Sequence, residues 1–314
     1  MPGARRYWAA LAGAGMLAAA APPASSGEPP PRPTAANTVT GVTVTPEKTP
    51  DPLVSPTNEF VRRHLPESTF SEQYPRFRDP VCVKVVGLPA EYAGFVSKRI
   101  VEVAGQVHAP VAKAETCAPN VHVVFTTAPQ ALLSDIAKRK DILLGFYWNA
   151  NGLKRLATFK GAVGAWYVTA TRDDHGENRL EIHDPAAWLN PRAGRAGSRL
   201  TNGMSAELEH SLIIADAGKV AGEKIDAVAD YVAVVALARW QGLDRCSAIP
   251  TILNLLAEGC DPATAPEAAT PADLGLLTAL YAVDPFELGS HQRMSMASRM
   301  RTEMAKADSA KAER

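Results

Sequence analysis

The chain has no excess of charge of either sign. Its 314 residues include 33 Lys and Arg and 33 Asp and Glu, so the formal net charge is zero. Surfaces that bind nucleic acid or an anionic membrane are built from an excess of basic side chains. We therefore expect neither nucleic acid nor an anionic membrane surface as a partner.

The chain also lacks an apolar run long enough to span a membrane once its N-terminus is removed. Arg5-Arg6 is followed by an apolar stretch from Tyr7 to Ala21, and Ala24-Ser25-Ser26 resembles a cleavage site. This pattern predicts a secretory signal peptide over residues 1–26 and a periplasmic or secreted mature protein without a transmembrane span. The two arginines are compatible with the general and the twin-arginine export routes, and Tyr7-Trp8 favours the general one.

Cysteine is scarce. The chain has four cysteines, none at the close spacing of zinc knuckles: Cys82, Cys117, Cys246 and Cys260. An even number in an exported chain predicts disulfides. Three pairings are formally possible, and we expect Cys82–Cys117 and Cys246–Cys260 because each pair lies within one half of the chain. Oxidised cysteines cannot act as nucleophiles, and the sequence has neither a G-x-S-x-G elbow nor a P-loop.

The segment after the signal peptide is rich in proline and poor in large apolar residues. Residues 27–57 include Pro29-Pro30-Pro31 and predict a flexible linker, because too little surface can be buried there to offset chain ordering. Val42–Thr45 could add a strand to a sheet, although extended coil is our preferred interpretation. Ser55-Pro56 predicts the start of a short helix through His64. At the other end, residues 306–314 predict a disordered tail.

Strands and helices alternate over residues 58–200, which predicts an α/β subdomain. We expect strands at Val81–Val86, Val121–Phe125 and Ala162–Thr169, and helices at Ala90–Val107 and Gln130–Lys140. A turn at residues 173–176 predicts a hairpin into Arg179–His183, with His175 and His183 exposed beside the turn.

From Gly203 onward the pattern becomes helical. The expected helices are Ser205–Asp216, Ile225–Trp240, Ile249–Leu256, Pro271–Tyr281 and Ser290–Met304. They predict a helical subdomain over residues 201–305. The predicted fold class is therefore α+β, with a small mixed sheet and helices in the N-terminal half and an all-helical C-terminal half.

The segment Ala206-Glu207-Leu208-Glu209-His210 resembles the H-E-x-x-H signature of zinc peptidases with its first histidine replaced by alanine. In the intact motif, two histidines on one helical face bind zinc and the glutamate polarises the bound water. Glu207 would then be the catalytic base and His210 a metal ligand. In the structural alternative, which we prefer, Glu207 favours the positive start of a helix and His210 is a hydrogen-bonded core histidine. A di-iron site is disfavoured, because no second E-x-x-H occurs.

Two aspartates could complete a metal site with His210. Asp216 lies six residues beyond it and could be a third ligand, or it could end the helix before Ala217-Gly218. Asp230 lies at the edge of an apolar stripe and needs a partner if it is buried. We prefer a structural role for Asp230, such as a bond to His210 or to a loop, over metal binding. Trp166-Tyr167 could flank a substrate groove, although aromatic residues in strands more often pack in the core.

Several stretches together resemble a family of uncharacterised secreted bacterial proteins with no assigned activity. They span residues 79–305 and are Cys117–Val121, Ala165–Val168, Glu209–Asp216, Ala229–Ala233 and Pro271–Tyr281. More distantly, the order of strands and a hairpin, a motif-bearing helix, a second helix and a Leu- and Tyr-rich terminal helix is similar to the zincin-like metallopeptidases. This second resemblance implies a zincin-like fold in which Ala206 replaces one zinc ligand.

Three functions are open on this sequence. We expect an exported envelope protein with a zincin-like fold that has lost zinc-dependent hydrolysis, carries no cofactor and binds a peptide or another envelope component. The alternative is a zinc metallopeptidase whose missing ligand comes from Asp216, Asp230 or a histidine of the hairpin. The third is an unrelated α+β protein in which the five-residue match is accidental.

Overall fold

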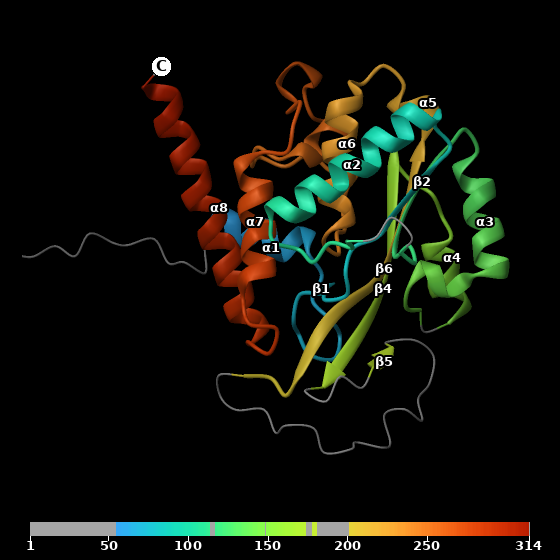
Figure 1. Ribbon diagram of the computed structural model, residues 1–314, viewed down its shortest axis with the longest axis horizontal. Helices are drawn as coiled ribbons and strands as arrows, with labels where there is room; N and C mark the ends of the chain where they lie inside the picture. Colours follow the sequence, from blue (N-terminus) through green and yellow to red (C-terminus); the bar gives the residue numbers. More distant parts are fainter. Residues whose placement is uncertain (1–54, 114–116, 148, 174–177, 181–200, 314) are drawn as a thin grey trace, which may run out of the picture. The chain divides into compact units, whose positions relative to one another are not determined.

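The computed structural model describes residues 55–113, 117–147, 149–173, 178–180 and 201–313 (Figure 1). The predicted signal peptide, almost all of the predicted linker, and His175 and His183 lie outside the described residues. The described residues belong to one compact unit. No helix in the described part of the chain has both the length and the apolar character needed to cross a membrane.

A six-stranded mixed sheet lies at the centre of this unit. Its strands are β1 (Arg76–Phe77), β2 (Val83–Val86), β3 (Val121–Thr126), β4 (Val163–Asp173), β5 (Asn178–Leu180) and β6 (Met204–Asp216). The order is β2-β3-β6-β4-β5, and β1 pairs with the first half of β6. The pairs β2–β3, β3–β6 and β1–β6 are parallel, whereas β4 is antiparallel to β5 and β6. The predicted small mixed sheet with surrounding helices is therefore confirmed.

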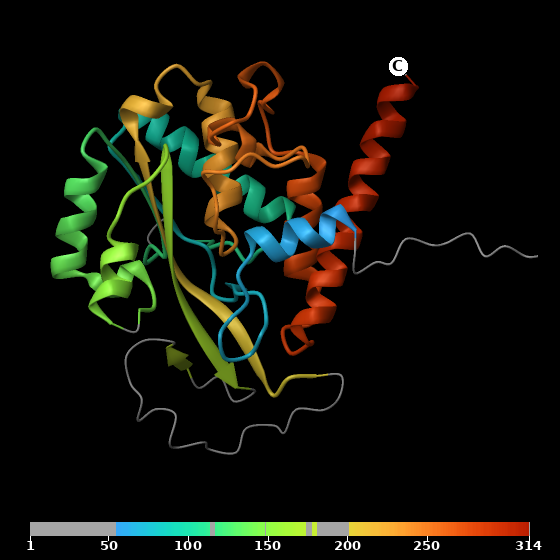
Figure 2. The same cartoon turned by 180° about the vertical axis from the view of Figure 1, so that it is seen from behind.

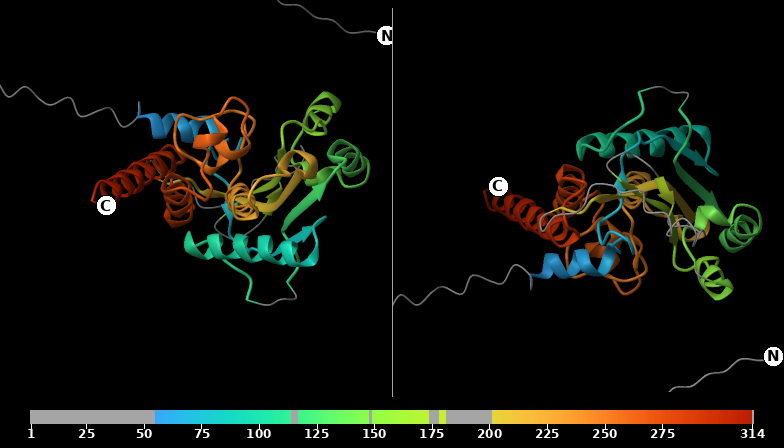
Figure 3. Two further views of the ribbon diagram at one scale, coloured as in Figure 1. Left: turned by 90° about the horizontal axis from the view of Figure 1, so that it is seen from above. Right: turned by 90° about the horizontal axis from the view of Figure 1, so that it is seen from below.

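Helices cover both faces of the sheet (Figures 1 and 2). The α-helices are α1 (Pro56–His64), α2 (Ala90–Gln106), α3 (Pro129–Arg139), α4 (Ala150–Leu156), α5 (Ala217–Val220), α6 (Ile225–Ala236), α7 (Pro271–Ala282) and α8 (Gly289–Ala312). The described residues also form the short 3-10 helices η2 (Asp141–Leu144), η4 (Ile252–Leu256) and η5 (Pro262–Thr264). Viewed from above, α2 and the pair α3 and α4 lie on opposite sides of the sheet (Figure 3). We call these sides the α2 face and the α3 face.

Each face of the sheet packs against its own hydrophobic cluster, because side chains alternate between the faces along a strand. On β3, Val121, Val123 and Phe125 belong to the large cluster formed with α2 and α6. On β6, Ile213 belongs to the same cluster, whereas Leu212 belongs to the smaller cluster under α3, η2 and α4. The second half of β6, from Ser211 to Ala215, is therefore buried on both faces of the sheet.

The predicted helix at Ser205–Asp216 is wrong, because this segment is strand β6. The continuous apolar run Leu212–Ala215 fits a helix and a strand with two buried faces equally well. The β-branched residues Ile213 and Ile214 and the pairing with β3 decide in favour of the strand. Because β6 lies between β3 and β4, the sheet takes strands from both predicted subdomains, and the helical region begins only at Ala217.

Other predicted elements differ mainly at their ends. α1 and α7 agree closely with their predictions, whereas α6 ends at Ala236 instead of Trp240. The predicted helix at Ile249–Leu256 is only the 3-10 helix η4. α8 continues to Ala312, so residues 306–312 are helical and not a disordered tail.

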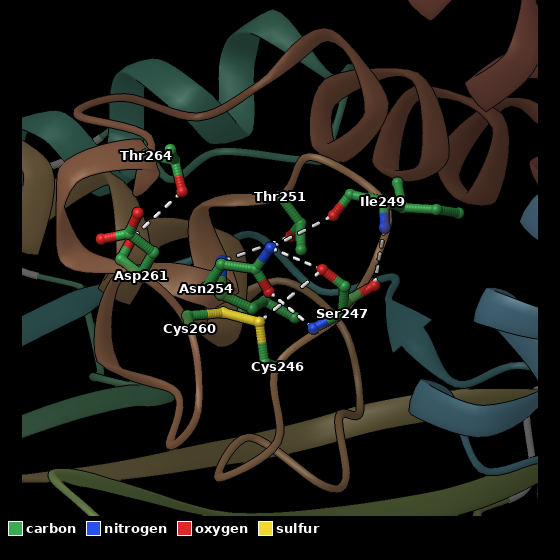
Figure 4. The surroundings of a disulfide bond; sticks show 9 residues. Cys246, Ser247, Ile249, Thr251, Asn254, Cys260, Asp261 and Thr264 are labelled. Atoms are coloured by element: carbon green, nitrogen blue, oxygen red, sulfur yellow. Dashed lines mark hydrogen bonds between the residues drawn. A yellow bond between two sulfur atoms is a disulfide. The ribbon is translucent and has the colours of Figure 1, made fainter.

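Both predicted disulfides are confirmed. Cys82–Cys117 and Cys246–Cys260 have Cα–Cα distances of 6.0 and 5.2 Å. Around the second disulfide, Asn254 ties the chain together by accepting from the Ser247 N–H and donating to the Ser247 and Ile249 carbonyl oxygens (Figure 4). The disulfide therefore fastens a loop that already has internal hydrogen bonds.

Candidate functional site

The segment Ala206–His210 lies in the middle of β6, where the pairing with β4 is irregular. His210 pairs with Val168 and Leu208 pairs with Thr169, so Glu209 is an extra residue on β6, a β-bulge. Glu207 pairs with Ala170, two residues from Val168 on the unbroken strand β4. Glu207 and His210 therefore project from the same face of the sheet, although the reason is a bulge and not a helical turn.

Ala206 projects from the opposite face. Its partner on β4 is Thr171, and its neighbour Leu208 lies in the large cluster of the α2 face. Alternation along β6 places Ala206 on the α2 face as well. The position at which an intact motif would carry its first histidine is thus separated by the sheet from Glu207 and His210.

A group of polar side chains lies on the α3 face beyond the edge of the smaller hydrophobic cluster. It consists of His122, Arg172, Ser205, Glu207 and His210, and we call it the polar strip. Beyond the level of α3 and α4, β4 and β6 remain paired, and the short strands β5 and β1 add to their outer edges at Ala170–Arg172 and at Glu207–Leu208 (Figures 1 and 2).

Glu207 is bound from two sides. Its side chain is an ion-pair partner of Arg172, with 2.9 Å between Nε and Oε2, and it accepts from the Ser205 hydroxyl at 3.1 Å. Only 3% of Glu207 is exposed. Burial raises the pKa of Glu207, and the nearby guanidinium of Arg172 opposes this rise. The carboxylate is therefore held by Arg172 and does not face an open position.

Arg172 gathers three carboxylates. Besides Glu207, its guanidinium donates to Glu209 at 2.9 Å and to Asp79 at 3.2 Å. A planar guanidinium carries five N–H donors and can bind several carboxylates at once. Arg172 thus joins β4, the bulge of β6 and the segment before β2.

The His210 side chain is hydrogen-bonded to another histidine, His122. Nδ1 of His122 and Nε2 of His210 are 2.7 Å apart, and the ring centroids are 4.8 Å apart. The centroid distance is close to the hydrogen-bond length plus one ring radius on each side. The two rings therefore lie nearly end to end, with the two nitrogens pointing at each other.

Burial determines the protonation of this histidine pair. It lowers the pKa of His210 from its ordinary value to about 4, with a smaller contribution from His122. The pKa of His122 is also lowered, by burial and by Lys84. Nδ1 of His210 is buried and has no hydrogen-bond partner among the described residues. We assign it as the unprotonated nitrogen, because an unpaired N–H would cost more, so Nε2–H of His210 donates to His122.

This geometry does not fit a zinc ion. Two nitrogens that share a tetrahedral zinc, each at about 2.1 Å, are about 3.4 Å apart, whereas those of His122 and His210 are 2.7 Å apart and face each other. Among the described residues, no three His, Cys, Asp or Glu side chains are grouped so that they could hold a metal. Zinc would require both rings to turn away from their present hydrogen bond.

The two aspartates proposed as further ligands lie elsewhere. Asp216 ends β6 and caps α5, accepting from the Gly218 N–H at 3.0 Å. Asp230 is buried on α6, where it pairs with Arg99 of α2 and accepts from the Ala269 N–H at 2.8 Å. Asp230 therefore holds α6 to α2 and to the segment before α7. This is the loop-binding role that we preferred, with Arg99 in place of His210.

The aromatic pair on β4 packs in the interior, as expected. Trp166 lies in the smaller cluster and donates its indole N–H to the Leu156 carbonyl oxygen at 2.7 Å. Tyr167 points to the α2 face and donates its hydroxyl to the Val235 carbonyl oxygen at 2.9 Å. The roles of His122 and Arg172 could not be predicted from the sequence, since both residues come from strands far from the motif. Only the alternation in Val121–Phe125 shows that His122 faces away from Val121 and Val123.

Comparisons with family models, with curated proteins and with solved structures find no match to this chain.

Proposed function

We propose that this chain is an exported, non-catalytic binding protein, in which Ala206–His210 stabilises the sheet and carries out no chemistry. The observation that carries this proposal is the environment of Glu207. A general base must reach the proton that it removes, whereas the carboxylate of Glu207 is buried against Arg172 and Ser205. The other candidate ligands are engaged with His122, Gly218 and Arg99.

Export is supported by the cysteines. All four described cysteines are paired in disulfides, and disulfides persist mainly in oxidising compartments such as the periplasm or the exterior of the cell. Together with the signal-like N-terminus, this favours a periplasmic or secreted location.

The rival function, a zinc peptidase with a substituted ligand, requires Glu207, His210 and a third acid to converge. The observed contacts do not favour this convergence, because His210 would have to leave His122 and because Asp216 lies at the far end of β6. The strand conformation of the motif also favours the third interpretation of the sequence, in which the match to H-E-x-x-H is accidental. A zincin-like ancestry is not needed for the binding function proposed here.

The test combines metal analysis with an activity assay. The mature protein is purified, dialysed against metal-free buffer, analysed for zinc by mass spectrometry and incubated with a peptide library with and without added zinc. We expect less than stoichiometric zinc and no cleavage above background, in the wild type and in Glu207→Gln. Glu209→Gln is the matched control, because it also removes one carboxylate from Arg172. Stoichiometric zinc together with cleavage that Glu207→Gln abolishes and Glu209→Gln retains would overturn the proposal.

A further inference from the structure

Part of the outer edge of β4 has no strand partner among the described residues. β6 pairs with β4 along its whole length, whereas β5 pairs only with Ala170, Thr171 and Arg172. An unpaired edge presents backbone N–H and C=O groups that can accept another strand. The first half of β4 is therefore a place where this sheet can be extended.

The hydrogen-bond pattern shows which groups point outward. Asp216 N–H donates to the Ala162 carbonyl oxygen at 2.9 Å, so these two residues form a hydrogen-bonded pair. In an antiparallel ladder such pairs alternate with pairs whose N–H and C=O groups point away from the partner strand. Val163 and Ala165 therefore direct their N–H and C=O groups away from β6. Further along, Gly145 lies against the Tyr167 carbonyl oxygen and closes the edge there.

This open edge borders a groove of about 330 Å³. One side of the groove is formed by the end of α4 and the chain that follows it, from Arg155 to Lys160. The other side is formed by the chain that follows α6, from Trp240 to Asp244. The indole rings of Trp166 and Trp240 are buried and fixed by hydrogen bonds to backbone oxygens. The groove thus combines unpaired backbone groups with two firmly held aromatic side chains.

The second wall is fastened at both ends. Gln241 N–H donates to the His64 carbonyl oxygen at 2.8 Å, and Glu258 N–H donates to the Asp244 carbonyl oxygen at 3.0 Å. The Cys246–Cys260 disulfide lies two residues beyond Asp244 and Glu258 and joins the same two segments (Figure 4). A wall that is already ordered loses little conformational entropy when a ligand binds.

The charges along the groove are mostly positive. Arg155 and Lys160 are exposed, and neither has an ion-pair partner among the described residues, whereas Asp244 is the only acidic side chain that lines the groove. Two unpaired cations at one groove favour a ligand that carries carboxylates, because complementary charge steers and orients a partner.

We propose that this groove binds an extended acidic peptide, which adds as a strand to β4 at Val163–Ala165 and directs a carboxylate side chain toward Arg155 and Lys160. Strand addition is a common mode of peptide recognition, in which backbone hydrogen bonds give affinity and side-chain contacts give specificity. This inference rests on the binding function proposed above and identifies its ligand class and site.

The test uses a fluorescein-labelled octapeptide of alternating valine and threonine with two glutamates, and binding is followed by fluorescence anisotropy. Ala165→Pro removes one outward N–H without removing a bond to β6, and proline is tolerated on edge strands. We expect saturable binding that weakens about fivefold in Ala165→Pro, as the loss of one hydrogen bond of about 1 kcal/mol implies. The same peptide N-methylated at alternate residues loses the bonds from its own side and should bind equally weakly to the wild type.

A second pair of variants tests the charges. Arg155→Glu with Lys160→Glu should weaken binding at least as much as Ala165→Pro. Arg301→Glu with Lys311→Glu on α8 is the matched control, because both side chains are exposed and neither lines the groove, and binding should not change. A probe with lysines in place of the glutamates should bind the wild type more weakly.

Three outcomes would overturn the inference. The first is the absence of saturable binding by the acidic probe. The second is that the wild type binds the N-methylated probe as tightly as the unmodified probe. The third is a dimer in light scattering that Ala165→Pro converts to a monomer, which would assign the edge to a second copy of the chain. If the probe is neither bound nor cleaved, this inference fails but the proposed non-catalytic function is unaffected. Zinc-dependent cleavage of the probe would overturn both proposals.

Discussion

The histidine pair predicts a specific dependence of stability on acidity. Burial lowers the pKa of His210 from its ordinary value of 6.5 to about 4 in the folded protein, and a difference of this size corresponds to up to about 3 kcal/mol at about 1.36 kcal/mol per pH unit. Above pH 6.5 His210 is neutral in both the folded and the unfolded chain, so its contribution is fully present. Between pH 6.5 and about 4 only the unfolded chain binds the proton, and the contribution is lost.

The measurement is the free energy of unfolding in urea at a series of pH values from 7 to 4. His210→Leu removes the titrating ring and fills the same space with an apolar side chain. As the pH falls through this range, we expect the wild type to lose up to about 3 kcal/mol of unfolding free energy relative to His210→Leu. Glu207 is present in both proteins, so its titration cancels when their unfolding free energies are subtracted. This matters because the raised pKa of Glu207 increases stability as the pH falls, opposite to the effect of His210.

The control is Val168→Ala, which truncates the cross-strand partner of His210 without adding or removing a titrating group. It should lower stability by a similar amount at every pH, so that its curve stays parallel to that of the wild type. If the curve of His210→Leu is also parallel to that of the wild type, His210 is not buried as a neutral ring and the assignment of the histidine pair is wrong.

Two further predictions concern the packing that supports the site. Asp230→Ala should lower the free energy of unfolding by about 3 kcal/mol, because it leaves Arg99 and the Ala269 N–H without their buried partner; Asp226→Ala on the same helix should cost less than about 1 kcal/mol, and equal losses in urea unfolding would contradict the structural role of Asp230. Replacing Cys246 and Cys260 by serine should lower stability by about 3 kcal/mol in the chain-entropy model, since the disulfide closes a loop of sequence separation 14. An unchanged urea midpoint would show that the loop is held by its hydrogen bonds alone.

Much of the fold could be predicted from local patterns. The alternation in Val121–Phe125, the amphipathic pattern of Ala90–Val107 and the proline at the start of α7 depend on residues close in sequence, and each agrees with the structure. The disulfides could be predicted for the same reason, since each joins cysteines in one half of the chain. In contrast, β6 is buried on both faces, and its pattern alone does not distinguish a strand from a helix.

The candidate site was harder to predict because its partners are distant in sequence. Glu207 forms an ion pair with Arg172, and His210 is hydrogen-bonded to His122. Both contacts require β3, β4 and β6 to be adjacent. The bulge at Glu209 is also invisible in the sequence, yet it is what places Glu207 and His210 on one face. A motif of five residues therefore predicted a site whose geometry depends on three strands.

The central claim is that Ala206–His210 belongs to a strand and not to a zinc-binding helix, and zinc titration of Ala206→His by calorimetry tests it most directly. On β6, residue 206 lies on the α2 face of the sheet, whereas His210 lies on the α3 face, so the two imidazoles cannot bind one ion. The account predicts no gain in zinc affinity over the wild type and a loss of stability of about 1–3 kcal/mol from overpacking. A gain in zinc affinity of about tenfold or more, equal to about 1.4 kcal/mol, would contradict it.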